Sequence, residues 1–544
     1  MPNLNQQLNG EFQSAQLSMA AYANLTPGMS EAAYIQALQD VGFTGTLATD
    51  FAARYTVESV TQGPQFTAFG FFAVVFKDNT TQQNILSIRG VNNLGDVPDI
   101  LNIALIGSLN LSSQYGVLED YFKFLNDTGV ILPTDQIAVT GHSLGGFLAQ
   151  GFAADTSFNP DPMDPNTPFN TRVSQAFTYN APGFGGLFSD ILNALGGTNP
   201  FVPTVPPGTV TNLVASNGLS PIGSQGQHIG EEQDLFVEAG APLHNHEIQT
   251  LTDSLAEYDL FGRIDANVTI PTITHILNAA SAMPDESLEN TLTALQRLFL
   301  NQNVAIPTDD RSTLFLEITA LETRTVDGQP NSPLLLDGMK TVIDLTGIPT
   351  GSLLNLAEGD IVYRYALTQL NPFVVLGVNY NELNQDGALD VFNPADGSGT
   401  LTHDYLTDRA EFLAKKIEVN QADGGLLVGL TNFFNDTHFE DFRSKGFQTR
   451  DEIQAGLFTQ IFLTPREFLF GDEQSNVLPG QSNDDHLYGG GGHDVLMGQG
   501  GIDYLEGNVG NDILIGGTEN DTLQGGQGFD LYISMTGDGN DRIE

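Results

Sequence analysis

The sequence predicts an α/β domain followed by an all-β domain. A strand-like run, residues 137–140, passes through a glycine-flanked serine into a helical pattern. Strand-like and helix-like segments alternate around it, which favours a parallel, doubly wound sheet. From Gly471 a nine-residue period replaces this alternation. We therefore expect three parts: an α/β domain at 1–300, a connecting, partly helical region at 301–470, and an all-β domain at 471–544.

The individual elements follow from the spacing of apolar residues. Residues 11–40 show helical spacing, as do residues 115–125 and 250–300. Continuous apolar runs predict buried strands, because strands covered on both faces lack alternation. Such runs lie at residues 69–76, 85–88, 176–179 and 210–215.

Composition excludes several classes of partner. Asp and Glu number 66 against 19 Lys and Arg, and this net charge of −47 opposes binding to nucleic acid or to anionic membranes. The chain contains no cysteine, so its stability must come from packing or from metal. No basic residue precedes Arg54 and no apolar run has transmembrane length, so we expect neither a secretory signal peptide nor a membrane span.

The junction after residue 140 has the form Gly141-x-Ser143-x-Gly145. A serine between two glycines on a strand-to-helix turn is a nucleophile elbow. A side chain at either glycine would collide with the tight crossing of strand and helix. The strained turn presents the Ser143 hydroxyl at the tip of the sheet, and the N–H of Leu144 at the helix start is available to an oxyanion.

Two apolar inserts, residues 99–112 and 183–208, interrupt the α/β pattern. Each is either packed core or surface loop, or else a lid or acyl-binding surface. Exposed apolar patches beside a serine site would suit a lipid substrate.

Seven units of nine residues run from Gly471 to Ile533. The eighth place is leucine in the first six units and tyrosine in the seventh, and we expect it to point inward. The sixth place is Asn476 in the first unit and aspartate in the rest: Asp485, Asp494, Asp503, Asp512, Asp521 and Asp530. Oxygen ligands of this kind suit Ca²⁺. The pattern resembles the nonapeptide calcium repeat of RTX proteins.

That resemblance implies a parallel β-roll with calcium ions between successive turns. Without calcium the rows of carboxylates repel, so the roll should not form. Extracellular modules bind Ca²⁺ at ~10⁻⁴–10⁻³ M, which makes the repeat a folding switch after export. The resemblance also implies the type I secretion machinery and an extracellular location. Because the repeat is still fading at Glu544, we expect the natural chain to continue with an uncleaved signal.

Residues 85–260 resemble the class 3 lipases of the α/β-hydrolase fold. Arg89-Gly90-Val91 is similar to that family's oxyanion segment, and the elbow at Ser143 is similar to its nucleophile. The resemblance implies an oxyanion hole made by the backbone N–H groups of Val91 and Leu144. This sequence has valine at position 91 where the family has threonine, so a side-chain contribution to the oxyanion hole is lost or moved.

Several histidines compete for the role of base. His246 follows the last predicted strand and opens a helix, which is where the fold carries its base, so we predict His246. His244 and His228 are the alternatives, although His228 resembles a histidine that the family carries without catalytic duty. His142, next to the nucleophile, is expected to point away.

The acid of the triad is the least determined part. The places that the resemblance indicates hold Asn217 and Asn180 rather than aspartate. Either an asparagine orients the histidine or a carboxylate further on does so, with Asp234 and Glu238 as candidates. We predict Asp234.

Together these features predict a secreted, calcium-folded serine ester hydrolase that acts at a lipid–water interface as a triacylglycerol lipase. The motifs do not separate this activity from that of a phospholipase A1. An alternative of another class is an RTX toxin or adhesion module with an inactive hydrolase domain.

Overall fold

The computed structural model describes residues 4–62, 66, 70–90, 113–156, 158, 169–184, 202–215, 226–238, 246–280, 286–302, 306–307, 310–330, 332–421, 437–442, 447–448 and 466–544. The chain divides into two compact units, residues 1–274 with 306–339 and residues 275–305 with 340–544. The predicted boundaries at 300 and 470 do not coincide with this division. Within the described segments, no helix has the length and apolarity needed to cross a bilayer.

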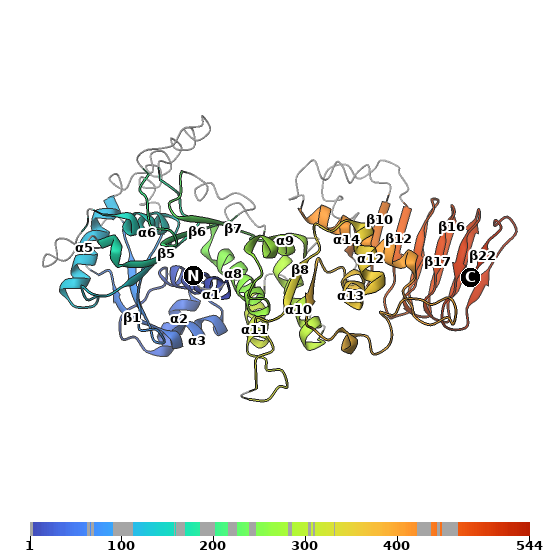
Figure 1. Ribbon diagram of the computed structural model, residues 1–544, viewed down its shortest axis with the longest axis horizontal. Helices are drawn as coiled ribbons and strands as arrows, with labels where there is room; N and C mark the ends of the chain where they lie inside the picture. The colour runs from blue at the N-terminus through green and yellow to red at the C-terminus, as the bar shows by residue number, and fades with distance from the viewer. Residues whose placement is uncertain are drawn as a thin grey trace. The chain divides into compact units, whose positions relative to one another are not determined.

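The first unit is built on one seven-stranded sheet (Figure 1). Its strands are β1 (Tyr55–Val60), β2 (Ala73–Asp78), β3 (Asn84–Ile88), β4 (Ile137–His142), β5 (Val173–Tyr179), β6 (Val210–Ala215) and β7 (Glu231–Leu235). Its helices are α1 (Leu4–Ala20), α2 (Glu31–Gln39), α3 (Gly45–Arg54), α5 (Ser113–Asp127), α6 (Leu144–Ala154), the 3-10 helix η4 (Phe169–Arg172), α8 (Ile248–Ile264) and α11 (Arg311–Glu322). The predicted α/β class is confirmed.

The spatial order of the strands follows their order in the chain. β1, β2 and β3 pair antiparallel, and β3 to β7 pair parallel. A doubly wound sheet was predicted, but the strand order never reverses. Successive right-handed crossovers in one direction fall on one face, so a second layer of helices must come from elsewhere in the chain.

Alternating side chains of the strands show which helices form each layer. Leu86 and Val139 belong to one apolar cluster with residues of α5 and α6. The next residue of each strand points to the opposite face and meets α1: Ser87 Oγ donates to Leu17 O at 2.8 Å, and Thr140 Oγ1 lies 2.7 Å from Ser18 Oγ. The N-terminal helix α1 therefore forms the second layer, and α8 packs against it.

The predicted helix over residues 11–40 was wrong in its extent, because two helices, α1 and α2, share it. The loop between them contains Pro27 and Gly28, and Gly28 has a φ of 74°, which favours glycine. The Ser30 side chain then caps α2 by accepting a hydrogen bond from Ala33 N. Similarly, the strand predicted at 69–76 begins only at Ala73.

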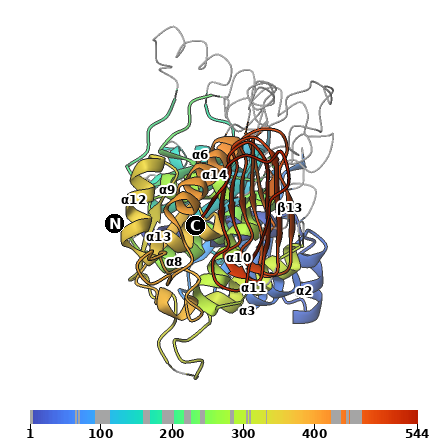
Figure 2. The same cartoon turned by 90° about the vertical axis from the view of Figure 1, so that its right-hand side faces the viewer.

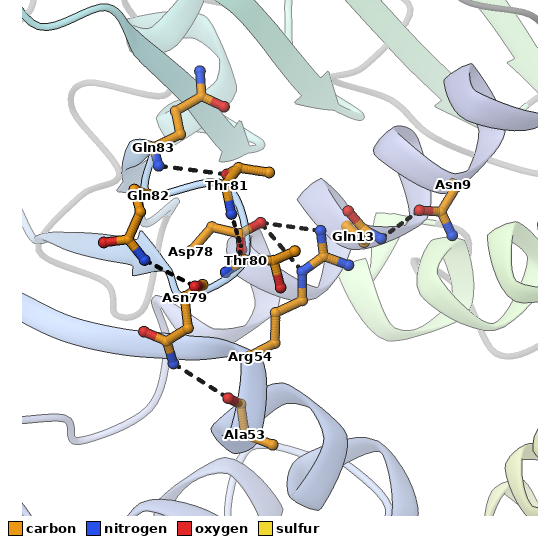
Figure 3. A network of polar contacts seen from close by, with 10 residues as sticks. All are labelled: Asn9, Gln13, Ala53, Arg54, Asp78, Asn79, Thr80, Thr81, Gln82 and Gln83. Carbon is orange, nitrogen blue, oxygen red and sulfur yellow. Dashed lines mark hydrogen bonds and ion pairs between the residues drawn. The ribbon is translucent and has the colours of Figure 1, made fainter.

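A charged contact fixes the turn between β2 and β3 (Figure 3). Asp78 Oδ2 accepts hydrogen bonds from Arg54 Nε at 3.2 Å and Nη2 at 3.0 Å, and Oδ1 accepts from the backbone N–H groups of Thr80 at 2.7 Å and Thr81 at 3.1 Å. Burial alone would raise the pKa of Asp78, but these bonds from Thr80, Arg54 and Thr81 outweigh it and lower that pKa.

The second unit contains a helical part and a stack of short strands. Its helices are α10 (Ser287–Leu300), α12 (Thr350–Gly359), α13 (Ile361–Gln369), the 3-10 helix η6 (Tyr380–Leu383) and α14 (His403–Gln421), while α9 (Ile270–Ala280) crosses the boundary between the units in sequence. β8 (Thr341–Asp344) and β9 (Phe373–Leu376) pair antiparallel.

The remaining strands form a β-roll of two sheets (Figures 1 and 2). The first sheet has the order β11 (Phe447–Gln448), β10 (Thr437–Asp441), β12 (Arg466–Phe470), β14 (His486–Tyr488), β17 (Tyr504–Glu506), β20 (Thr522–Gln524) and β22 (Arg542–Ile543). The second has the order β13 (Val477–Pro479), β16 (Val495–Gly500), β19 (Ile513–Thr518) and β21 (Leu531–Ile533), and β15 (Gly491–Gly492) pairs with β18 (Val509–Gly510).

Two nonapeptide units make one turn of the roll. Leu487 pairs with Leu505 in the first sheet, and Leu496 pairs with Leu514 in the second, each in parallel register. The leucines of the eighth place form one buried cluster between the sheets, as predicted. Figure 2 views the roll along this stack of turns.

The roll extends beyond the seven predicted units at both ends. β12, which precedes residue 471, already pairs in parallel with β14. At the other end β22 pairs with β20, and Asp541 Oδ1 accepts a hydrogen bond from Asp521 N at 3.3 Å. Asp541 thus stands where a further sixth-place aspartate would stand, after a turn that is longer by two residues.

Helix α14 covers part of the first sheet. The ring of Tyr405 packs edge-on against Phe470 and Tyr488, with centroids 5.7 and 5.2 Å away. Asp408 Oδ2 accepts the Tyr488 hydroxyl at 2.5 Å. The outward residues of the second sheet, by contrast, are mostly apolar, although β16 also exposes Gln499 and β19 exposes Thr518.

We expect Asp78→Asn to destabilise the first unit by about 2 kcal/mol, because the substitution weakens charge-assisted hydrogen bonds to Arg54 at a buried carboxylate. Thermal unfolding of the full chain would measure this. Asp120→Asn is the control, since the Asp120 side chain is 71% exposed and its partner Lys123 lies 3.6 Å away. Equal losses in the two variants would contradict the prediction.

Candidate active site and calcium sites

Ser143 stands between β4 and α6 in a strained conformation, with φ 56° and ψ −125°. A Cβ on Gly141 would lie 2.5 Å from the backbone of Gly145, and a Cβ on Gly145 would lie 2.8 Å from the carbonyl of Arg89. Ser143 N donates to Tyr179 O at 2.9 Å, which continues the pairing of β4 with β5. These contacts hold the turn closed, and the strain marks the site as a functional candidate.

His246 lies beside this serine. Its Nε2 is 3.0 Å from Ser143 Oγ, a hydrogen-bonding distance between residues 103 positions apart. His246 comes just before α8, which starts at Ile248 with Glu247 as its N-cap. Burial lowers the pKa of His246 to about 4, so its ring is neutral near pH 7 and able to accept a proton.

Of the two predicted oxyanion donors, only Leu144 lies among the described residues. Leu144 is the first residue of α6, where a backbone N–H has no partner within the helix. Val91 lies outside the described residues, but Gly90, immediately before it, lies close to the nucleophile: a Cβ on Gly90 would be 3.1 Å from Ser143 Cβ.

The candidates for the acid occupy different places. Asp234 is largely exposed on the edge strand β7, and its pKa is raised, first by partial burial and then by Glu232, although His228 opposes the shift. Asn180 is fully buried, and its Oδ1 accepts from Ala215 N at 3.0 Å, so it joins the ends of β5 and β6. Glu238 is half-buried just after β7. Asn217 lies outside the described residues.

The two alternative bases, His228 and His244, also differ in what the structure says of them. His228 has both ring nitrogens engaged, with Nδ1 2.6 Å from Glu232 Oε2 and Nε2 2.7 Å from Ala181 O. That arrangement ties β7 to the segment after β5. His244 lies outside the described residues.

His142 was expected to point away from the site, and this expectation was wrong. Its Nε2 lies 2.6 Å from the carbonyl oxygen of His246, and its Nδ1 lies 2.9 Å from the hydroxyl of Tyr22. Sequence reasoning missed both residues, because Tyr22 comes from the loop after α1, 120 positions away. The inserts predicted as lids, 99–112 wholly and 183–208 in part, lie outside the described residues.

In the roll, three groups converge in the units that begin at Gly480, Gly489, Gly498 and Gly507: the first-place glycine, the sixth-place carboxylate of the same unit, and a glycine carbonyl two units later. A Cβ on Gly489 would lie 2.6 Å from Asp494 Oδ2 and 2.6 Å from Gly507 O. A Cβ on Gly507 would lie 2.6 Å from Asp512 Oδ2 and 2.6 Å from Gly525 O. Only glycine leaves this oxygen-lined cradle open.

The two oxygens of these carboxylates differ. Oδ1 accepts a backbone N–H from the preceding turn, as in Asp485 N to Asp503 Oδ1 at 2.8 Å. Among the described residues, Oδ2 is buried without a hydrogen-bond partner in Asp494, Asp503, Asp512 and Asp521. Asp485 and Asp530 also accept a backbone N–H at Oδ1, from Glu467 at 2.7 Å and Asp512 at 3.0 Å.

An orphaned buried carboxylate oxygen opposes folding unless a cation meets it. Burial raises the pKa of Asp494 to about 7 and that of Asp503 to about 8. Since these values exceed that of an unfolded aspartate, ~3.9, a metal-free roll loses stability as the pH rises from about 4 to about 8. Nowhere in the described parts of the chain do three His, Asp or Glu side chains gather around one point. Each site would therefore combine few carboxylates with backbone carbonyls, a donor set that fits Ca²⁺.

Comparison with known proteins supports the assignment of the repeat. Residues 466–496 and 497–532 match the family of RTX calcium-binding nonapeptide repeats, so the predicted RTX region is confirmed. No curated protein matches the chain.

Several solved structures of fungal lipases are similar to part of the chain. The Lip2 lipase of Yarrowia lipolytica is 21% identical with a TM-score of 0.28, over 45% of this chain and 84% of that one. A Rhizomucor miehei lipase–propeptide complex is 17% identical with a TM-score of 0.28, over 42% and 67%. A triacylglycerol lipase of Penicillium expansum is 16% identical with a TM-score of 0.26, over 43% and 80%.

We expect Gly489→Ala to raise the calcium concentration at the midpoint of roll folding at least ~10-fold, about 1.4 kcal/mol. The added Cβ would fill the cradle beside Asp494 Oδ2. Circular dichroism of the full chain, titrated with Ca²⁺ after chelation, measures the midpoint. Gly500→Ala is the matched control, because a Cβ there would meet only Thr518 Oγ1, at 3.0 Å. A β signal that survives chelation, or equal midpoints in the two variants, would rule the prediction out.

Proposed function

We propose that the chain is a serine hydrolase of lipid acyl esters whose C-terminal roll folds on calcium. The observation that carries the proposal is the 3.0 Å contact between Ser143 Oγ and His246 Nε2 at a strained strand-to-helix turn. A hydroxyl held by a neutral imidazole in this way is an activated nucleophile.

The reaction proceeds through an acyl-enzyme. Ser143 Oγ attacks the ester carbonyl while His246 Nε2 takes its proton, and the alkoxide leaves with that proton. The oxyanion accepts hydrogen bonds from the backbone N–H groups of Leu144 and Val91. Water then gives a proton to His246 and attacks the acyl group, which releases the fatty acid and restores Ser143.

A third residue is required to fix the tautomer of His246, since Nε2 must be the acceptor and Nδ1 must carry the proton. Asp234 is the candidate that we carry forward. Its exposed place on β7 means that it would have to reach the base from the edge of the sheet. Asp234→Asn, which keeps the shape but removes the charge, tests this role.

Triacylglycerol is the substrate that we favour, because the apolar inserts at 99–112 and 183–208 suit an uncharged lipid at an oil–water interface. Phospholipase A1 activity is the second candidate. Calcium serves folding, and binding at millimolar concentration suits an extracellular protein exported by the type I route. An inactive hydrolase domain carried by an RTX toxin or adhesion module is the alternative of another class.

Fatty-acid release from a triacylglycerol and from phosphatidylcholine, measured side by side in millimolar calcium, tests the proposal. We expect release from the triacylglycerol and at least a ~10⁴-fold loss in Ser143→Ala. Ser174→Ala is the control, since that serine is exposed on β5 and bonds only structural groups, including Ile137 O at 2.9 Å. Release from the phospholipid alone would favour the phospholipase, and release unchanged in Ser143→Ala would overturn the serine mechanism.

The pH dependence of kcat/KM gives a second test. His246 acts only when neutral, and its buried ring has a pKa lowered to about 4. The acid limb for a soluble ester is therefore expected near pH 4 rather than at the ordinary histidine value of ~6.5. Circular dichroism at each pH separates this limb from unfolding. An acid limb at about 6.5 would mean that the base is not a buried, desolvated histidine.

A further inference from the structure

A continuous chain of hydrogen bonds runs beneath the site. Gly90 N lies 3.1 Å from the Tyr22 hydroxyl, and that hydroxyl lies 2.9 Å from His142 Nδ1. His142 Nε2 then lies 2.6 Å from the carbonyl oxygen of His246, whose own ring contacts Ser143. The chain thus joins the end of β3, the loop after α1, the end of β4 and the start of α8.

The chemistry of the groups fixes the direction of every proton. The carbonyl of His246 can only accept, so His142 Nε2 must carry a hydrogen. The Gly90 N–H can only donate, so the Tyr22 hydroxyl accepts there, and a neutral His142 with its hydrogen on Nε2 accepts the Tyr22 proton at Nδ1. All contacts are satisfied when His142 is neutral and protonated at Nε2 alone.

The surroundings keep His142 in that state. The residue is 6% exposed. Burial and the neighbouring His246 lower the pKa of His142 to about 3, although the bond to the His246 carbonyl raises it. The two imidazole rings are 5.1 Å apart, so a neutral ring here adds no second charge when His246 takes up a proton.

The space around the chain is closed. A Cβ on Gly90 would lie 2.6 Å from the Tyr22 hydroxyl and 2.5 Å from His142 O. The backbone of Gly90 is therefore pressed against the same two residues that hold His246. Movement of either residue would displace the base and the start of the oxyanion segment together.

We propose that Tyr22 and His142 are positioning residues, which hold the main chain of His246 so that its ring meets Ser143 in the geometry required for proton transfer. The inference rests on the proposed hydrolase function and deepens it. Together Tyr22 and His142 orient the base through its backbone, which a triad acid acting on the ring does not do.

Tyr22→Phe removes one hydroxyl and leaves the ring in place. Misplacing a base by about 1 Å costs up to ~10²-fold in rate. We expect kcat on a soluble ester to fall at least ~10-fold with KM unchanged. Tyr115→Phe is the matched control. It also removes a phenol hydrogen bond, of 2.8 Å to Asp155, but Asp155 lies at the end of α6 opposite to Ser143. The proposal is overturned if kcat falls equally in both variants, or if kcat does not fall in Tyr22→Phe.

A rescue experiment separates positioning from mere support of the fold. His142→Leu removes both bonds and is expected to lose ~10²-fold in kcat. A glutamine amide can donate to the His246 carbonyl and accept from Tyr22, so His142→Gln should recover most of that loss. Combining Tyr22→Phe with His142→Leu should cost no more than His142→Leu alone, since the pair acts as one unit. A shared role would be contradicted if the losses of kcat in the two single variants add in the double variant, or if His142→Gln recovers no activity.

Two readouts distinguish failure of this inference from failure of the proposed function. Reaction of wild-type Ser143 with an alkyl phosphonate ester reports the nucleophile itself, and no reaction there rejects the hydrolase function. Nitrogen-15 NMR of labelled histidines reports the tautomer of His142 without any turnover. We expect protonation at Nε2 in the wild type and a changed signal in Tyr22→Phe but not in Tyr115→Phe. An Nδ1-protonated His142 in the wild type would overturn the positioning role even in an active enzyme.

Discussion

Close approach of backbone to backbone at the turn between β4 and α6 is the constraint on which the site depends. Gly141 and Gly145 leave no space for a Cβ, and Ser143 between them takes a φ of 56°. This one turn directs the serine hydroxyl toward His246 and starts α6 with unpaired N–H groups. It also sets the neighbouring residue, His142, beneath the base instead of beside the substrate. The strain is therefore tied to three separate parts of the chemistry.

The roll follows the opposite logic, because it repeats one arrangement every 18 residues, as in the pairing of Leu487 with Leu505. Each central nonapeptide unit buries a leucine between the sheets and a carboxylate at the corner. The leucine favours folding and the orphaned carboxylate oxygen opposes it, so the balance depends on a cation. The proposed calcium dependence would give such a segment two states, folded with calcium and unfolded without it. The covering helix α14 adds contacts such as Tyr405 on Phe470, which are independent of the cation cradles.

The sequence predicted those parts of the fold and site that depend on a local residue pattern, and it did not predict those that depend on distant contacts. The elbow, the eighth-place leucines and the strands near residues 85 and 210 follow from short, regular spacings, and they were found. β7 was missed, because Glu231-Glu-Gln-Asp-Leu235 carries the charges of an edge strand rather than an apolar run. The helix over 11–40 was overextended across Pro27 and Gly28. His142 could not have been assigned, since its partner Tyr22 is brought to it only by the packing of α1 on the sheet.

The same non-local packing bears on the acid. A triad acid does two things: it fixes the orientation and tautomer of the base, and its charge stabilises the imidazolium. When the backbone of His246 is anchored by His142, part of the orientation no longer depends on the acid. Asparagine at both of the sequence places where the fold carries an acid, 180 and 217, is compatible with such a division of roles. What an uncharged residue cannot supply is the electrostatic stabilisation, so a carboxylate further along the chain would still be needed for its charge and for the tautomer of His246.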